Sequence, residues 1–229
     1  MPSAKSEEWE EKVGCPVLEL WGMTELAGPG VMQHSYGENR LGSVGIEMLY
    51  VRARIADPEE PSKTLPNGEV GELMVAGPLV MMGYFGNDTA TREAIEPDGW
   101  LHSGDLAKMD DEGYIFIVDR KKDMILTAGY NIYPAEIERV ISGHPNVAMV
   151  GVGAKPDPEK GEIAKAYVVL KPNESCLPQE IQEYCRDHLA AYKVPREVQL
   201  VPDLPTTSTG KILRRELYTL EMTAPAGAE

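Results

Sequence analysis

Residues 119–138 read DRKKDMILTAGYNIYPAEIE, and the character of the sequence changes across this stretch. From about residue 46 to residue 118, short alternating runs such as VRARIAD and GYIFIVD are separated by turn residues, which is typical of antiparallel strands. Beyond it, strand-like runs alternate with amphipathic helical patterns. We therefore expect two domains, residues 1–120 and residues 121–229, with a short hinge near Lys122 because no Gly/Ser-rich linker separates them.

The quoted stretch predicts a hairpin followed by a helix. The hairpin covers residues 123–132 and turns at Ala128-Gly129, and Pro134 stands at the first helical position, where its missing N–H costs nothing. An apolar stripe at helical spacing follows, made of Ile137, Val140 and Ile141. The rest of this domain predicts a second helix over residues 178–190 and strands over residues 147–152, 164–170 and 197–201. This order predicts a small mixed α/β domain.

The preceding domain has a different pattern. A short helix is expected over residues 6–13 and ends at Gly14, and an extended run and a Gly/Pro-rich loop follow up to about Gly45. The short strands after it favour a distorted antiparallel, β-barrel-like subdomain, with a helix over residues 88–95. The fold class predicted for the chain is therefore α+β.

Composition and charge limit the classes of partner that the chain is expected to bind. Of the 229 residues, 42% are hydrophobic and 26% are charged, and the net charge is −15, so we expect a globular chain that repels the nucleic-acid backbone. An anionic small molecule would need basic residues concentrated at a site. Two such groups are present, one at residues 120–122 and one formed by Lys211, Arg214 and Arg215.

The cysteines and the apolar runs indicate the compartment. Three scattered cysteines favour neither a disulfide framework nor a zinc site, and they are typical of a reducing cytoplasm. The charged N-terminal stretch has no signal-peptide pattern, and no apolar run approaches the 18 residues that a transmembrane helix needs. We expect a cytoplasmic protein that does not cross a membrane.

Four segments carry the functional signal: LELWGMTE (18–25), GWLHSGD (99–105), the stretch at residues 119–138 and LPTTSTGKILRREL (204–217). In this order and spacing they resemble the later motifs of the adenylate-forming superfamily, which contains acyl-CoA synthetases, peptide-synthetase adenylation domains and insect luciferases. The chain looks like the C-terminal part of an acyl-CoA synthetase. The resemblance implies that a carboxylic acid and ATP form acyl-AMP, with Mg²⁺ as cofactor, and that CoA then takes the acyl group.

The first segment is implied to bind the nucleotide. Trp21 stands where the family usually has a tyrosine, and its flat ring is expected to pack on adenine. Gly22 is expected to let the backbone approach the nucleotide, and Met23 lies in the same nucleotide-binding run. By resemblance, Thr24 donates to a phosphate oxygen and Glu25 helps to hold Mg²⁺, which prefers carboxylate and phosphate oxygens.

The next two segments are implied to hold the ribose and the hinge. Asp105 would accept both ribose hydroxyls through its two carboxylate oxygens. Arg120 matches the arginine that contacts the ribose and phosphate region, and Lys122 matches the pivot. Ala128, Gly129 and Tyr130 resemble the loop that lines the channel for the CoA thiol, where a glycine leaves room for the pantetheine arm.

Lys211 is implied to be the catalytic lysine. It would bridge the carboxylate and the α-phosphate during adenylation, where a fixed cation stabilises the growing negative charge. Residues 206–210 give a flexible loop to deliver it. A Walker A motif is excluded, because Pro205 stands where the first glycine is needed and Ile212 stands where Ser or Thr is needed.

Three functions stay open at this point. The family's earlier Ser/Thr/Gly-rich phosphate loop and its acyl pocket have no counterpart before Leu18, so we expect the chain to be part of a larger synthetase and to have little activity alone. It could instead belong to an adenylation domain that loads a carrier protein. A non-catalytic module that binds nucleotide or CoA is the third function. The identity of the acid and assembly into a homo-oligomer are left open.

Overall fold

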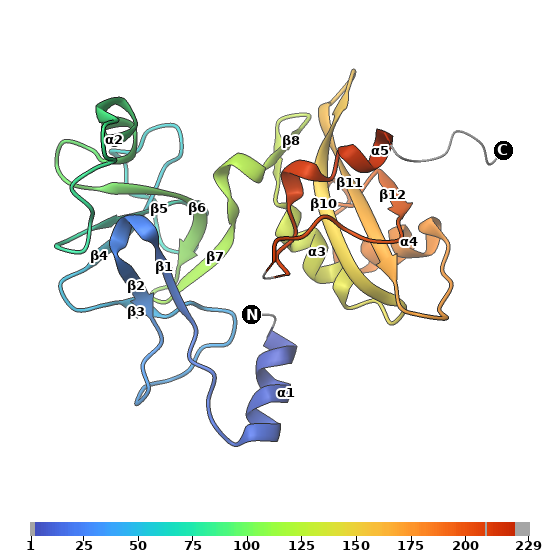
Figure 1. The fold of residues 1–229 in the computed structure, drawn as a ribbon, viewed down its shortest axis with the longest axis horizontal. Coiled ribbons are helices and arrows are strands. Elements are labelled where there is room, and N and C mark those ends of the chain that lie inside the picture. Colours follow the sequence, from blue (N-terminus) through green and yellow to red (C-terminus); the bar gives the residue numbers. More distant parts are fainter. Residues whose placement is uncertain (1–2, 209, 223–229) are drawn as a thin grey trace. The chain divides into compact units, whose positions relative to one another are not determined.

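The computed structural model describes residues 3–208 and 210–222. The chain divides into two compact units, Met1–Lys121 (unit 1) and Lys122–Glu229 (unit 2) (Figure 1). The 3₁₀ helix η2 (Lys121–Asp123) contains the boundary between them. Among the described residues, no helix is both long enough and apolar enough to cross a membrane.

The first unit begins with a helix and a small antiparallel sheet. Helix α1 (Ser3–Val13) ends at Gly14, whose φ of 71° lets its N–H bond the Glu10 carbonyl oxygen at 2.8 Å. Strands β1 (Leu20–Met23), β2 (Gly28–Met32) and β3 (Ile46–Glu47) form the sheet in that order, and the 3₁₀ helix η1 (Thr24–Leu26) connects β1 with β2.

A second antiparallel sheet follows, in the order β4-β5-β6-β7. Its strands are β4 (Arg52–Ala56), β5 (Gly71–Ala76), β6 (Leu101–Met109) and β7 (Ile115–Arg120). Helix α2 (Asp88–Ala94) lies between β5 and β6, and the side chain of Asn87 caps it by accepting a hydrogen bond from Ala90 N at 3.0 Å.

The two sheets enclose one core. Ile115 on β7 exchanges backbone hydrogen bonds of 2.9 Å with Val44 and Gly45, just before β3. Gly45 has a φ of 99°, and a Cβ there would lie 2.0 Å from the Met32 backbone, so only glycine fits. The core residues come from both sheets: Trp21, Leu26, Val31, Val51, Ile55, Leu73, Val75, Leu101, Ala107 and Ile115. Among the described residues the two sheets do not close into a barrel.

The second unit begins with the predicted hairpin. Strands β8 (Ile125–Thr127) and β9 (Tyr130–Ile132) pair antiparallel, and the turn residues Ala128 and Gly129 have φ of 48° and 84°. Two positive φ values define a type I′ turn, whose twist matches that of the strands. Helix α3 (Pro134–Ser142) follows and has Pro134 in its first turn, as predicted.

The centre of this unit is an antiparallel pair, β10 (Val147–Asp157) and β11 (Gly161–Leu170). β12 (Glu197–Leu200) pairs parallel with β11, and β8 meets β11 through Thr127 and Gly161. Helix α4 (Pro178–His188) precedes β12. The short elements η3 (Arg214–Glu216) and α5 (Thr219–Met222) come last.

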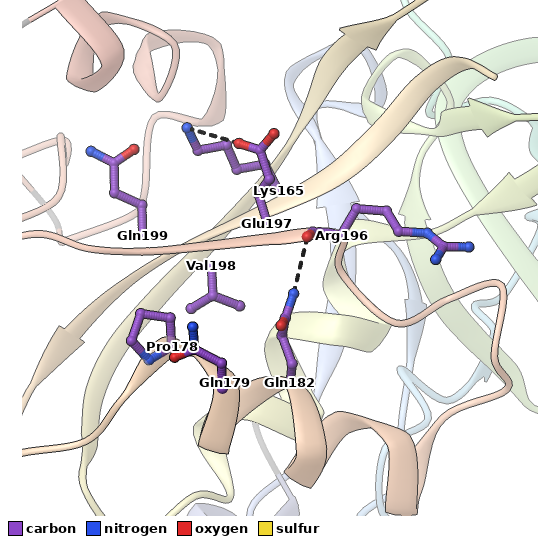
Figure 2. A pocket seen from close by; sticks show the side chains of 8 residues that line it. All are labelled: Lys165, Pro178, Gln179, Gln182, Arg196, Glu197, Val198 and Gln199. Carbon is purple, nitrogen blue, oxygen red and sulfur yellow. Dashed lines mark hydrogen bonds and ion pairs between the residues drawn. The ribbon is translucent and has the colours of Figure 1, made fainter. Parts of the chain in front are cut away.

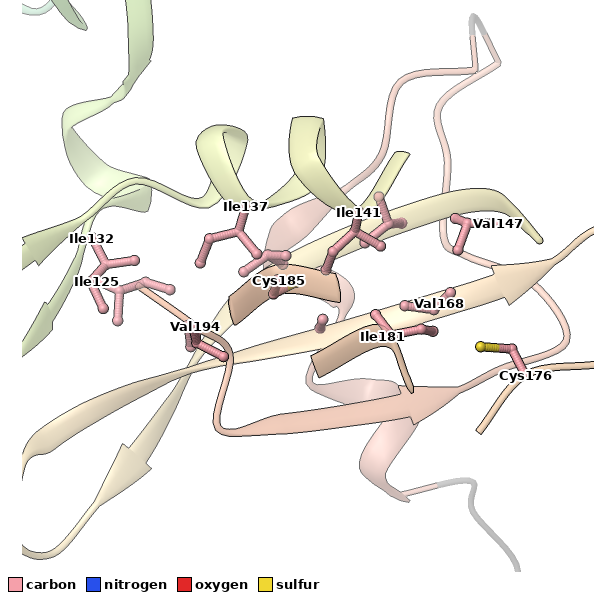
Figure 3. Packing of buried hydrophobic residues seen from close by; sticks show 14 residues of the cluster. Ile125, Ile132, Ile137, Ile141, Val147, Val168, Cys176, Ile181, Cys185 and Val194 are labelled. Carbon is pink, nitrogen blue, oxygen red and sulfur yellow. The ribbon is translucent and has the colours of Figure 1, made fainter. Parts of the chain in front are cut away.

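Both faces of this central sheet are covered, because neighbouring side chains on a strand point to opposite faces. Ala166 and Val168 belong to the cluster that includes Ile137 and Ile141 of α3 and Ile181 of α4 (Figure 3). Tyr167, between them, packs instead with Leu204 and Leu217 of the C-terminal segment. The observed mixture of sheets and covering helices confirms the predicted α+β class.

Candidate functional site

Asp105 on β6 is held by donors from two directions. It lies opposite Arg120 in the β6–β7 register, and Arg120 Nε is 2.7 Å from Asp105 Oδ1. The indole Nε1 of Trp21 donates to Asp105 Oδ2 at 2.8 Å. The Asp105 side chain is 11% exposed. Since a carboxylate offers about four acceptor positions, each oxygen keeps one for another donor.

The backbone at Asp105 is fixed by a buried carboxylate that the sequence did not reveal. Gly104, with φ of 69°, donates its N–H to Glu72 Oε1 at 3.2 Å. Glu72 is 3% exposed, and its Oε2 accepts from Lys121 Nζ at 3.0 Å and lies 3.3 Å from His102 Nδ1. A glutamate inside the otherwise apolar strand GELMVA was the only signal in the sequence that could have found it.

Trp21 and Gly22 have clear structural roles in the middle of β1. Only 8% of Trp21 is exposed, so most of its ring is covered by the core, and the polar contact it makes is with Asp105. A Cβ on Gly22 would lie 2.5 Å from the Gly28 carbonyl oxygen, so the close approach of β2 already requires a glycine there. Met23 packs, half-buried, against the same core.

Thr24 and Glu25, the next two residues, are the first two residues of η1. Thr24 is exposed and Glu25 is half-buried. Tyr84 donates its Oη–H to Glu25 Oε1 at 2.8 Å, and this hydrogen bond raises the pKa of Tyr84 above its ordinary value. Carboxylate oxygens suit Mg²⁺, which binds one or two carboxylates together with phosphate oxygens and waters, so Glu25 fits such a role. No motif in the sequence points to Tyr84, which is 59 positions from its partner.

The hinge candidate lies between two anchored neighbours. Lys121 is tied to unit 1 through Glu72 and through the Pro58 carbonyl oxygen, 3.1 Å from its Nζ. Asp123 is tied to unit 2 through Arg214, with 3.3 Å between Oδ2 and Nη1. Lys122 between them is exposed.

The turn between β8 and β9 presents Ala128, Gly129 and Tyr130 to solvent. A Cβ on Gly129 would meet no atom within 4 Å, so its φ of 84° is what favours glycine here. Tyr130 is 58% exposed, and its ring stacks on that of Tyr192 with centroids 4.9 Å apart.

Lys211 lies in a tight hairpin. Thr206 and Ile212 form a β-bridge, Thr207 N donates to the Lys211 carbonyl oxygen at 2.8 Å, and Lys211 N donates to Thr207 Oγ1 at 3.1 Å. The Lys211 side chain is exposed. Thr209, part of the loop expected to be flexible, lies outside the described residues.

The structure therefore joins part of the predicted set. Trp21, Asp105 and Arg120 are in direct contact in unit 1. In unit 2, the β8–β9 turn and the Lys211 hairpin are separate segments. A groove of about 350 Å³ lies elsewhere in unit 2, between α4 and β12, where Lys165 is paired with Glu197 and Gln182 bonds the Arg196 carbonyl oxygen (Figure 2). It contains no residue of the predicted site.

The sequence motifs and the fold of the two units together indicate an adenylate-forming enzyme. The family model described as AMP-binding enzyme matches residues 1–85, and the one described as AMP-binding enzyme C-terminal domain matches residues 136–211. The chain belongs to the AMP-binding enzyme family.

Curated relatives are CoA ligases with different acids in their names. The chain is 43% identical over 206 residues to a feruloyl-CoA synthase of Amycolatopsis sp., covering 89% of this chain and 41% of the relative. It is 43% identical over 213 residues to a long-chain-fatty-acid–CoA ligase of Escherichia coli, covering 93% of this chain and 37% of the relative. The chain thus spans about 40% of the length of these relatives.

Solved structures give the same result. ATP-bound MatB from Rhodopseudomonas palustris matches with a TM-score of 0.89 at 33% identity, over 97% of this chain and 44% of that one. The o-succinylbenzoate CoA synthetase MenE from Bacillus subtilis, in complex with ATP and magnesium ion, matches with a TM-score of 0.83 at 36% identity, over 95% of this chain and 44% of that one.

Proposed function

We propose that this chain serves an ATP-dependent acyl-CoA synthetase. In the first step a carboxylate attacks the α-phosphorus of ATP, which gives acyl-AMP and pyrophosphate. In the second the CoA thiolate attacks the acyl carbon, and AMP leaves. The observation that carries the proposal is the Asp105 carboxylate, oriented by Trp21 and Arg120 and left with acceptor positions that suit two ribose hydroxyls.

The proposed roles in unit 1 concern the nucleotide. Asp105 accepts the ribose hydroxyls, and Arg120, whose side chain is 47% exposed, reaches the ribose and phosphate region. Thr24 donates to a phosphate oxygen, and Glu25 holds Mg²⁺, which would neutralise phosphate charge. The run Trp21–Gly22–Met23 forms the wall behind them.

The proposed roles in unit 2 concern the two steps of the reaction. The Lys211 ammonium bridges the carboxylate and the α-phosphate, where it stabilises charge that grows in the transition state. A rotation about Lys122 then withdraws it and presents Ala128, Gly129 and Tyr130 to the pantetheine arm of CoA. We place the reaction in the cytoplasm, since all three cysteines are free thiols.

A chimera tests the proposal. Residues 14–229 replace the matching part of the E. coli ligase, and pyrophosphate release and acyl-CoA formation are measured separately. We expect Lys211→Ala to slow adenylation about 10²–10³-fold, as for one lost charge stabiliser, while thioester formation from supplied acyl-AMP continues. Lys171→Ala, which removes another exposed lysine of unit 2, should change neither step. Equal losses in both steps would contradict the assigned role of Lys211.

Two alternative functions remain, and calorimetry on the 229-residue chain tests the first of them, a non-catalytic binding module. ATP, AMP and CoA are titrated into the wild-type chain and into Asp105→Ala. A chain that binds nucleotide, combined with a chimera that shows no turnover, would indicate a non-catalytic binding module. Transfer to a carrier protein in place of CoA would indicate an adenylation domain.

A further inference from the structure

Arg214 lies three residues beyond Lys211, and its guanidinium connects separate segments of unit 2. Nε and Nη2 bond the two carboxylate oxygens of Glu138 on α3, at 3.0 and 2.6 Å. Nη1 is 3.3 Å from Oδ2 of Asp123, the residue directly after Lys122. The three side chains are only 18–25% exposed. The lysine-bearing segment, α3 and the start of unit 2 therefore meet at one side chain.

Glu138 is itself fixed to the central sheet. Its Oε1 also accepts the N–H of Val152 on β10, at 2.9 Å. A two-pronged pairing of a guanidinium with a carboxylate is stronger and more directional than a single charge contact. Because the pair is largely withdrawn from water, it is screened less than an ordinary surface ion pair.

The backbone transmits this anchor to Lys211. Leu213 N donates to the Pro205 carbonyl oxygen at 2.8 Å, which closes the base of the hairpin immediately before Arg214. Ile212 lies over β10, where a Cβ on Gly151 would approach its side chain to 3.3 Å. The hairpin is thus held both by the apolar packing of Ile212 and by the contacts of Arg214.

We propose that Arg214 is a positioning residue for Lys211. It joins the Lys211 hairpin to Asp123, beside the hinge. The lysine and the start of unit 2 therefore move as one rigid body. This inference rests on the proposed function for its catalytic consequence, whereas the coupling itself is a property of unit 2. Without it, rotation about Lys122 would not deliver the ammonium to a fixed place.

The neighbouring Arg215 supplies a matched control. Its side chain is 82% exposed, and its ion pair with Glu216 is 3.8 Å long. Arg214→Gln and Arg215→Gln remove the same charge from adjacent positions of one segment, but only the first removes the contacts to Glu138 and Asp123. Arg214→Lys keeps the charge but loses the two-pronged pairing with the carboxylate. It should therefore restore the wild-type hydrogen exchange and adenylation only in part.

Hydrogen exchange on the 229-residue chain tests the coupling. In Arg214→Gln, the amides of Thr207 and Leu213 should exchange about tenfold faster, the change expected for losing a charged hydrogen bond. In Arg215→Gln they should be unchanged, and the amide of Val168 in β11 should stay protected in both. Equal effects of the two substitutions, no effect, or faster exchange spread through β11 would each overturn the proposal.

The chimera then tests the consequence for catalysis. Arg214→Gln should slow adenylation about tenfold and leave thioester formation from supplied acyl-AMP within about twofold, a split that simple loss of stability would not give. If Lys211→Ala impairs adenylation but Arg214→Gln does not, the positioning role is wrong. If Lys211→Ala has no effect while hydrogen exchange still changes in Arg214→Gln, the proposed function fails and the coupling stands.

Discussion

At the scale of single residues, Trp21 combines a structural and a polar role. Its ring is part of the core between the two sheets of unit 1, and its Nε1–H donates to one oxygen of Asp105. The tryptophan therefore gives Asp105 a second fixed donor in addition to Arg120.

Trp21→Phe tests this hydrogen bond through stability. The substitution leaves Asp105 Oδ2 without its indole donor and reduces the volume of a buried side chain, so we expect a loss of about 2 kcal/mol in the free energy of unfolding. Urea unfolding followed by circular dichroism measures it. Trp9→Phe is the control, because Trp9 is 56% exposed on α1. Equal stability of the two variants would show that the contact with Asp105 contributes nothing.

At the scale of elements, the start of α4 depends on one carboxylate. Glu180 accepts the N–H of Leu177 at 2.7 Å, and this hydrogen bond lowers the pKa of Glu180 below its ordinary value of 4.5. A carboxyl group with a lowered pKa binds its proton less tightly in the folded state than in the unfolded state. Its stabilising effect is therefore present above about pH 4.5 and is lost as the pH falls through the lowered value.

Glu180→Gln tests the pH dependence of this cap. At pH 7 the variant should be less stable than the wild type, because a neutral amide is a weaker acceptor at a helix N-terminus. The difference between the two midpoints of thermal unfolding should shrink as the pH is lowered below 4.5, where the wild-type carboxyl takes up its proton. A difference that stays constant from pH 7 to pH 3 would contradict the role of the charge.

The elements also show what the sequence could predict. The β8–β9 hairpin and α3 were predicted closely, because Gly129 and Pro134 act through their own backbone. β10 continues five residues past the predicted end, through Pro156, which pairs with Glu162. Proline is tolerated there because β10 is an edge strand in the described part of the sheet, and edge position follows from tertiary pairing.

The same reason explains what was missed in the candidate site. The motifs supplied Asp105 and Lys211, but the partners that orient the site come from distant positions. Tyr84 is 59 positions from Glu25, and Arg214 is 76 positions from Glu138. Such pairs are formed by packing, and no local period or turn signal records them. Burial of a lone glutamate in β5 likewise depends on the neighbours it finds, Lys121 and His102.

At the scale of the whole molecule, each unit has the means to be stable by itself. Unit 1 has one buried cluster between its sheets, and unit 2 has a cluster on each face of its central sheet. The anchors on either side of Lys122 also belong to different units, since Lys121 bonds Glu72 and Asp123 bonds Arg214. A change of backbone conformation at Lys122 would therefore leave both cores intact, which is what a hinge requires.

Lys122→Pro tests the hinge in the chimera. Proline fixes φ near −65° and restricts the preceding residue, so the backbone should keep only one of the two states that the reaction needs. We expect one of the two steps to slow by at least about tenfold and the other to stay within about threefold, as for a blocked conformational step. Lys122→Ala removes the charge without fixing φ and should leave both steps unchanged. Equal loss of both steps, or none, would contradict a pivot at Lys122.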